Sequence, residues 1–444
     1  MAWFSFDWIR GAFEYSAMKY ALRTYAAVIG LAAVLAALTA IADETPARRA
    51  LAWACMSDSS ETRSLQRRFP GSSLLDFRVR SFRGQPGQSQ HVLGLPSGGE
   101  LRITKVFPLG QLRRVSIEFY TPRSGGGLRA YEAVGGDGAC REIETRWIDY
   151  DLADRAEHLI IRRGDDHQDV PLNPPVPPGR DPGGVLVAVI DTGLNYQLPN
   201  IAARLARDEG GNILGYDFWD DDARPFDIDT GRSPFFPLHH GTAVTSIILR
   251  EAPNVRIAPY RFPRPDMARM ADVVAHADAV GARIVNLAMG SNKAEDWRAF
   301  EFAARARPHM LFVVSAGNNG RDIDSSPVYP AALALRNMVT VTSADAFGKL
   351  ADGSNWGRTH VDIMVPGERV AVIDHRGVRS QASGSSFAVP RIAALAARWL
   401  AANPTWTTQK LKQAIFSRAR PSSRQPDLPL AHGWLPDPTD DYLP

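Results

Sequence analysis

Gly384-Ser385-Ser386-Phe387-Ala388-Val389-Pro390 stands directly before Arg391–Leu400, a run rich in Ala and Leu that predicts a buried helix. The small polar residues before it, Gln381-Ala382-Ser383, place Ser386 on a turn from a loop into that helix. Pro390 is tolerated there because the N–H groups of a first helical turn have no intrahelical partner. Such N–H groups can hold a developing oxyanion, whereas an ordinary serine-rich N-cap explains the same residues equally well.

A serine hydroxyl is a weak nucleophile that needs a base, and the base needs an orienting group. The apolar run Val187–Ile190 ends in the carboxylate of Asp191 and a glycine turn. His240 stands at the start of a second apolar helix, and Asn318 follows another apolar strand. Taken singly, Asp191 is more simply a turn carboxylate and His240 a helix-start histidine.

Together these stretches resemble the subtilisin-like serine proteases (subtilases, peptidase S8 family). Asp-Thr-Gly at 191–193, His-Gly-Thr at 240–242, Ala-Gly-Asn at 316–318 and Gly-x-Ser-x-Ala-x-Pro at 384–390 occur in the family's order. The resemblance covers about residues 180–420. It implies a serine endopeptidase that forms an acyl-enzyme intermediate.

The resemblance also implies a role for each matching residue. Ser386 is the nucleophile, His240 the base, Asp191 the partner of the base, and Asn318 an oxyanion-hole donor with the Ser386 N–H. His239 is not expected to be the base, because the family's histidine directly precedes Gly-Thr.

A primary specificity pocket is implied around two segments that would pair with an extended polypeptide substrate. The family usually has Ser where Ala288 stands, so the shape of the pocket is in question. The predicted lining residues are Ala288, Met289, Gly290, Ser315, Ala316 and Gly317.

The 444 residues carry a net charge of +3, which argues against a nucleic-acid partner. Tyr25–Ala42 has no charge, Lys19 and Arg23 precede it, and Ala40-Ile41-Ala42 is a small-x-small cleavage pattern. We expect export through residues 1–42, as a signal peptide cleaved after Ala42 or as a retained anchor facing the periplasm or the cell exterior. The long segment before the hydrophobic run favours the anchor, and a buried Ala-rich helix is the alternative.

Cys55 and Cys140 are the two cysteines of the chain, and in an exported protein they are expected to pair. Neither stands near a motif that holds a base, so neither is expected to be catalytic. Residues 43–168 predict a small β-rich (α+β) domain, in which Val115, Ile117 and Phe119 alternate with polar residues. A prodomain-like role, an accessory role and a spacer all fit it.

The prolines of residues 169–183 predict an extended linker, and those of residues 421–444 an extended surface tail. Between them, residues 184–420 alternate apolar strands and helices, which predicts an α/β domain with a parallel sheet. The resemblance implies that this α/β domain is a subtilisin-like three-layer domain, and we expect the β-rich domain and an N-terminal hydrophobic helix to precede it. Asp191, the Ala288-Met289-Gly290 turn and Asn318 all fall at carboxyl ends of strands, where such sheets bind ligands.

Several aspartates crowd the loop before His240. We consider a solvated loop, an acidic rim that favours basic substrate residues, and a structural calcium site, although no ligand spacing matches a known calcium loop. No cofactor is required for the chemistry, no metal ligand is assigned, and the oligomeric state is left open. The aspartates are Asp217, Asp220, Asp221, Asp222, Asp227 and Asp229.

Three other functions compete with the subtilase interpretation. An aspartic protease would use the tripeptides at Asp191 and Asp229, but these lie 38 residues apart and the second follows no apolar strand. An α/β-hydrolase would need Gly-x-Ser-x-Gly, which here ends in Ala388, and would have to draw its acid and base from Asp427 and His432 in the tail. A catalytically inactive subtilase scaffold that only binds is the third.

Overall fold

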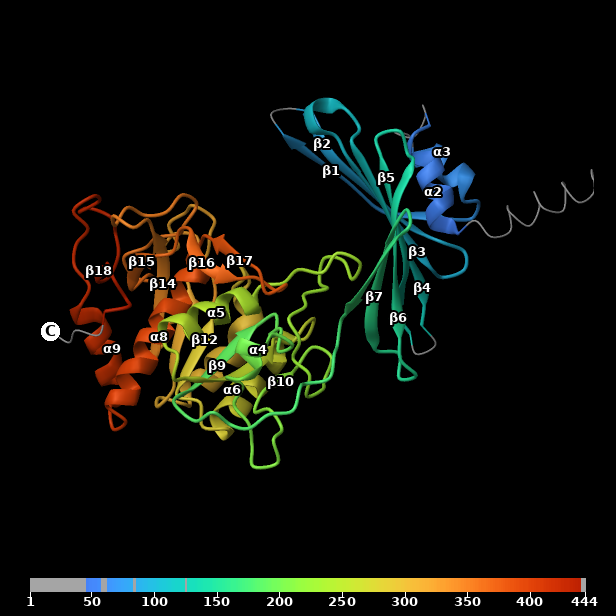
Figure 1. Cartoon of the computed structure of the whole chain (residues 1–444). Coiled ribbons are helices and arrows are strands. Elements are labelled where there is room, and N and C mark those ends of the chain that lie inside the picture. Colours follow the sequence, from blue (N-terminus) through green and yellow to red (C-terminus); the bar gives the residue numbers. More distant parts are fainter. Residues whose placement is uncertain (1–44, 57–61, 83–84, 124–125, 441–444) are drawn as a thin grey trace, which may run out of the picture. The chain divides into compact units, whose positions relative to one another are not determined.

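The computed structural model describes residues 45–56, 62–82, 85–123 and 126–440 (Figure 1). Contacts divide the chain into two compact units, residues 1–148 with 160–169, and residues 149–159 with 170–444. The predicted hydrophobic helix and signal or anchor of residues 1–42 lie outside the described residues. Within the described ranges, no helix combines the length and apolarity needed to cross a membrane.

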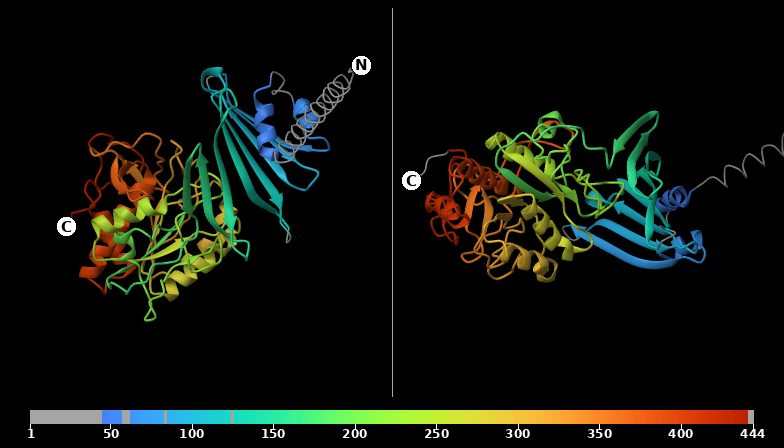
Figure 2. Two further views of the ribbon diagram at one scale, coloured as in Figure 1. Left: turned by 45° about the vertical axis from the view of Figure 1, so that its right-hand side comes forward. Right: turned by 90° about the horizontal axis from the view of Figure 1, so that it is seen from below.

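The N-terminal sheet has eight strands that lie side by side in chain order. Helices α2 (Pro46–Ala54) and α3 (Thr62–Arg68) lie on one of its faces, and α2 packs against β3, β4 and β5 (Figure 2). The strands, with one short 3₁₀ turn, are β1 (Ser73–Phe82), β2 (Gln85–Gly94), β3 (Glu100–Val106), η1 (Pro108–Gly110), β4 (Arg114–Pro122), β5 (Leu128–Asp137), β6 (Glu142–Tyr150), β7 (Ala156–Arg163) and β8 (Asp166–Pro171).

A disulfide joins Cys55, at the end of α2, to Cys140 in the turn between β5 and β6. Close to α2, the sheet buries two basic side chains. His91 is 2% exposed, and its ring lies edge-on to Trp53. Neither of its ring nitrogens has a hydrogen-bond partner among the residues that the structure describes. The ammonium of Lys105 lies 4.4 Å above the Trp53 ring. Burial, with a smaller contribution from Lys105, lowers the pKa of His91 to about 4.

We expect His91→Leu to make the N-terminal sheet less sensitive to acid. The folded state disfavours the imidazolium, so the unfolded chain binds more protons, and stability falls as the pH decreases from about 6.5 through about 4. The variant also removes two unpaired buried nitrogens, so its free energy of unfolding at pH 5 should rise by about 1–2 kcal/mol. Circular dichroism of both proteins during urea unfolding at pH 5 and pH 7.5 measures the difference. An equal loss of stability in acid would contradict the assignment to His91.

Residues 172–183, most of the predicted linker, form neither helix nor strand. Their carbonyl groups nevertheless accept hydrogen bonds from side chains of the second unit. Pro174 O accepts a hydrogen bond from Tyr196 Oη (2.7 Å), and Pro177 O accepts one from Arg207 Nη2 (2.8 Å). The segment is therefore part of the second unit rather than a free tether.

The second unit is built on an eight-stranded sheet, in which each described strand runs parallel to its neighbours. This confirms the predicted parallel sheet. The spatial order is β10 (Tyr216–Asp217), β11 (Arg256–Arg261), β9 (Leu186–Asp191), β12 (Ile284–Leu287), β13 (Leu311–Ser315), β14 (Met338–Ala344), β15 (Ile363–Pro366) and β18 (Gly433–Trp434).

Helices cover both faces of this sheet (Figure 1). Side chains along each strand point alternately to the two faces, so each face contributes apolar side chains to a core of its own. Val187 and Val189 of β9 face the core that includes α5, α8 and α9, whereas Ala188 and Ile190 face the core that includes α6 and α7. A two-stranded sheet, β16 (Val370–Ile373) with β17 (Arg379–Ala382), packs beside α5. The helices are α4 (Pro199–Ala202), α5 (Gly241–Glu251), η2 (Met267–Arg269), α6 (Met270–Ala279), η3 (Ala294–Trp297), α7 (Arg298–Arg305), α8 (Ser385–Ala402) and α9 (Thr408–Ser417).

Two expectations for the C-terminal half were wrong. Pro390 is the sixth residue of α8 and not part of its first turn, so the Ser386 carbonyl has no i+4 N–H donor. The tail from Pro421 does not simply run over the surface, because it adds β18 to the sheet edge and buries Leu435 completely. The tail packs against the domain because it carries the apolar side chains Leu430, Trp434 and Leu435, which are buried. The domain therefore extends beyond residue 420.

Candidate active site

Asp191 ends β9, a strand that is buried along its whole length. Its side chain is 3% exposed, and Oδ1 accepts hydrogen bonds from the Thr192 N–H (2.7 Å) and from His240 Nδ1 (2.8 Å). Two glycines let the turns carrying Asp191 and His240 approach each other. A Cβ on Gly241 would lie 2.0 Å from the Gly193 carbonyl oxygen, and Gly193 has φ +97°.

His240 caps the N-terminus of α5 and presents its imidazole to Asp191. Burial lowers the pKa of His240, but the Asp191 carboxylate outweighs it, and the pKa lies above its ordinary value. Since Nδ1 faces Asp191, Nε2 is the nitrogen left for proton exchange. The ring also lies 5.5 Å from that of Phe387, the residue after Ser386, so the starts of α5 and α8 are close together.

Ser385 and Ser386, the first two residues of α8, have different surroundings. Ser385 is fully buried, and its Oγ lies 2.7 Å from Ser315 Oγ and 3.0 Å from Asn318 Oδ1. Ser386 Oγ donates a hydrogen bond to the Ala288 carbonyl (3.2 Å). Among the described residues no hydrogen bond joins Ser386 to His240, so the contact for proton transfer is not made in the free chain.

Asn318 is fixed by its oxygen, which leaves its amide nitrogen available. Oδ1 accepts hydrogen bonds from the N–H (2.9 Å) and the hydroxyl of Ser385, and within the described part of the chain Nδ2 has no partner. This network assigns the amide orientation. Gly384 is required next to it, since its φ is +129° and a Cβ would lie 3.2 Å from Asn318 Oδ1.

Asn318 and Ser386 line one cavity of about 250 Å³. The other lining residues are Ala288, Met289, Gly290, Ser291, Asn292, Ser315, Gly317, Asn319 and Val328. Five of the six predicted pocket residues are among them, but Ala316 is not: it is fully buried in an apolar cluster with Ile323 and Val361. Ser291, Asn292 and Asn319 adjoin predicted residues and could have been included, whereas Val328 carries no signal in the sequence.

Two arginines from later in the chain pair with three aspartates of the acidic loop. Arg261, itself 2% exposed, pairs with both Asp217 and Asp220, while Arg269 pairs with Asp221. These pairs reduce the free negative charge that an acidic rim would offer, whereas a calcium site in the loop stays a prediction. The structure brings Asp229, the carboxylate of the second Asp-Thr-Gly, to the Gly231 N–H in a turn and not to Asp191.

Comparisons with known proteins show which family the second unit resembles. The family model described as "Subtilase family" matches residues 183–434. Among curated proteins, the chain is 30% identical over 250 residues to the thermophilic serine proteinase of Bacillus sp. (strain AK1), covering 53% of this chain and 56% of that protein. It is 26% identical to the halolysin-like extracellular serine protease Nep of Natrialba magadii, covering 53% and 43%.

Among solved structures, the chain is similar to a cold-adapted subtilisin-like serine proteinase, with 26% identity, a TM-score of 0.45, and coverage of 60% of this chain and 93% of that one. The chain spans about half the length of the curated relatives it matches. Since the family model covers more than half of the sequence, the chain belongs to the subtilase family.

Proposed function

We propose that this protein is a serine endopeptidase that hydrolyses polypeptides through Asp191, His240 and Ser386. One observation carries the proposal: an imidazole hydrogen-bonded to a buried carboxylate lies beside the start of α8, where Ser386 and Asn318 line one cavity. The four residues come from segments that are far apart in the sequence. A base, an orienting carboxylate, a hydroxyl and a free amide are the groups that acyl transfer uses.

The reaction begins with a reorientation of Ser386. Its hydroxyl gives up the Ala288 carbonyl and turns toward His240 Nε2, a contact that often forms only in the complex with substrate. Ser386 Oγ then attacks the scissile carbonyl while His240 accepts its proton. The imidazolium is stabilised by Asp191, consistent with the raised pKa of His240. His240 next protonates the leaving amine, and water releases the acyl group by the same steps.

Asn318 Nδ2 and the Ser386 N–H are the proposed oxyanion donors. Ser386 is the second residue of α8, so its N–H has no intrahelical partner. We expect Asn318→Leu to lower kcat by about 10²–10³ with little change in KM, the range known from the corresponding change in subtilisin itself. Steady-state kinetics on a peptide substrate measure the split. A rise in KM at unchanged kcat would instead assign Asn318 to substrate binding.

The cavity lining predicts the substrate side chain that binds there. None of its residues carries a charge, and burying a substrate charge without a partner is unfavourable. Peptides with an uncharged side chain on the amino side of the cleaved bond should therefore exceed matched Lys, Arg, Asp and Glu peptides by more than about tenfold in kcat/KM. Cleavage of a peptide library, read by mass spectrometry, tests this. A preference for basic residues would restore the acidic-rim interpretation.

We infer that the protein is exported, on the basis of the Cys55–Cys140 disulfide and the apolar run of residues 25–42. The choice between a cleaved signal and an anchor stays a prediction.

A fluorophosphonate probe tests the catalytic proposal directly. The processed protein should be labelled at Ser386, as located by peptide mass spectrometry, and His240→Ala should abolish labelling. Labelling of Ser386 excludes the inactive-scaffold alternative. A correctly folded protein that takes up no probe would establish that alternative.

A further inference from the structure

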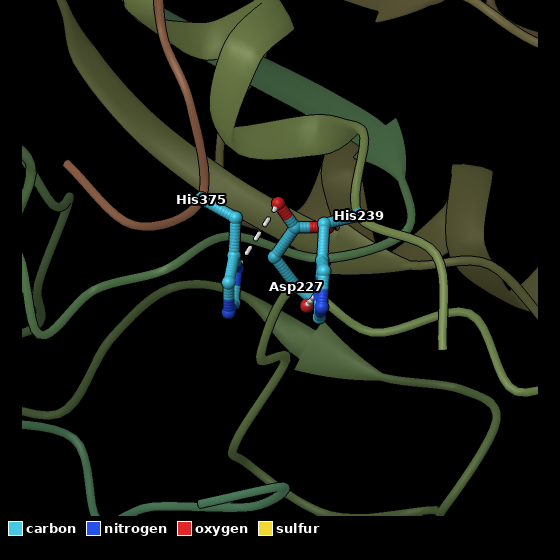
Figure 3. A group of neighbouring side chains, drawn as sticks. All are labelled: Asp227, His239 and His375. Carbon is cyan, nitrogen blue, oxygen red and sulfur yellow. Dashed lines mark hydrogen bonds and ion pairs between the residues drawn. The ribbon is translucent and has the colours of Figure 1, made fainter. Parts of the chain in front are cut away.

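Beside the proposed catalytic base lies a second group of side chains that the mechanism does not use. Asp227 comes from the loop between β10 and α5, His239 from the position before His240, and His375 from the turn between β16 and β17 (Figure 3). One potential ligand atom from each lies within 4.8 Å of the other two. Side chains from three separate segments thus meet at one point.

The Asp227 carboxylate is fully buried, and most of its hydrogen-bonding capacity is used. Oδ1 accepts hydrogen bonds from Thr192 Oγ1 (2.5 Å) and the His240 N–H (3.0 Å), and Oδ2 accepts one from the Thr242 N–H (2.9 Å). A carboxylate oxygen accepts about two such bonds, so one position on Oδ2 is left over.

His375 Nδ1 faces that unused position. It lies 3.7 Å from Asp227 Oδ2 and is buried without a hydrogen-bond partner among the described residues. This separation is too long for an N–H···O hydrogen bond. It is close to the roughly 3.4 Å between two ligands of a tetrahedral ion whose bonds are about 2.0–2.1 Å long. A cation between the two atoms would satisfy both.

His239 is held in the manner of many metal-binding histidines. Its Nδ1 lies 2.5 Å from the Asp227 main-chain carbonyl oxygen, so Nδ1 carries the proton and Nε2 keeps its lone pair. Its ring stacks on that of His375 with centroids 3.6 Å apart and 11° between the planes. One ring must therefore turn before both nitrogens can point at a single ion.

We propose that Asp227, His239 and His375 form a binding site for one zinc-class divalent cation, with water as a further ligand. Two imidazoles and one carboxylate are a donor set that zinc and cobalt accept in an open tetrahedral site. The His375 side chain is 14% exposed, so the site lies close to the surface. The site is distinct from the triad, but Asp227 also holds the N–H groups of His240 and Thr242. An ion bound to Asp227 therefore disturbs the hydrogen bonds that position the backbone of His240, and it inhibits the enzyme.

The binding test uses the full-length Ser386→Ala protein, which cannot digest itself and whose metal binding does not depend on the proposed catalysis. Calorimetric titration with Zn²⁺, and with Co²⁺ followed by its visible spectrum, should show one ion per chain and the intense bands of tetrahedral cobalt. His375→Gln and His239→Gln should each weaken binding by more than about tenfold. His309→Gln is the matched control, because His309 is exposed and pairs with Asp278 elsewhere in the unit.

Circular dichroism shows whether each variant is folded, and either folded variant suffices for the comparison. Unchanged affinity in a folded His375→Gln or His239→Gln protein would overturn the assignment, as would Ser386→Ala protein that binds no Zn²⁺ or Co²⁺. In the active enzyme, Zn²⁺ should lower kcat, and His375→Gln should abolish that inhibition. Because binding is measured in the Ser386→Ala protein, failure of this proposal and failure of the catalytic proposal give different results.

Discussion

Replacing Ser386 with alanine is expected to lower kcat for peptide hydrolysis by about 10⁶, the order known for removal of the nucleophile of subtilisin. The loss is this large because the neighbouring hydroxyl cannot take over the attack: Ser385 is fully buried and bound to Ser315 and Asn318. Hydrolysis of a chromogenic peptide by the two purified proteins measures the ratio. Intact mass spectrometry of both shows whether the chain also processes itself.

Ser385→Ala is the matched control for that experiment. It removes a neighbouring hydroxyl that does not line the cavity but helps to hold Asn318 Oδ1. The Ser385 N–H still holds the same oxygen, so we expect a loss of only about tenfold. If Ser385→Ala were as damaging as Ser386→Ala, or if Ser386→Ala kept most of the activity, the nucleophile would be wrongly assigned.

Replacing Asp191 with asparagine should lower kcat by about 10⁴ while the fold is retained. The side chain keeps its size, but its amide disfavours the imidazole tautomer that carries the proton on Nδ1. It also removes the charge that raises the pKa of His240. The plateau of kcat should therefore extend to lower pH in the variant, although its height is much reduced. A pH profile of kcat from about pH 5 to 10 measures both effects.

Asp229→Asn is the control for Asp191, because it alters the chain's other Asp-Thr-Gly tripeptide. Asp229 closes a turn onto the Gly231 N–H, so we expect kcat to change by less than about threefold. An aspartic protease would need both carboxylates. Equal loss in the two variants, together with inhibition by pepstatin, would revive that mechanism.

The strands that could be predicted best from the sequence are those whose apolar residues directly reflect their burial. β9 and β13 are largely β-branched or apolar runs, as a sheet covered on both faces requires. β17, with the sequence Arg-Ser-Gln-Ala, has no such pattern, and it is a strand only because β16 pairs with it. β2 is similar, since its Gly, Ser and Gln residues suggest a loop until β1 and β3 are in place.

The same distinction applies to the functional residues. Asp191, His240, Asn318 and Ser386 stand in short motifs whose glycines permit close backbone approach, so the sequence itself marks them. His375 stands in no motif and is 136 residues from His239. Only the turn between β16 and β17 brings it there. Ala316 was assigned to the pocket for the opposite reason, since its neighbours in the motif face the cavity while its own side chain faces the core.

The prolines of residues 171–182 bear on where the protein could be trimmed by its own activity. A protease that binds its substrate as an added strand needs an accessible segment whose main-chain N–H groups are free to form hydrogen bonds. Proline has no main-chain N–H group. Carbonyl groups of this stretch are already engaged by Tyr196 and Arg207. We therefore expect self-digestion to stop before Pro171, so that the mature enzyme keeps the proline-rich segment at its new amino terminus. A chain shortened to begin at Leu186 would lose the proline-rich segment, and Tyr196 and Arg207 would lose the carbonyl groups that they bind.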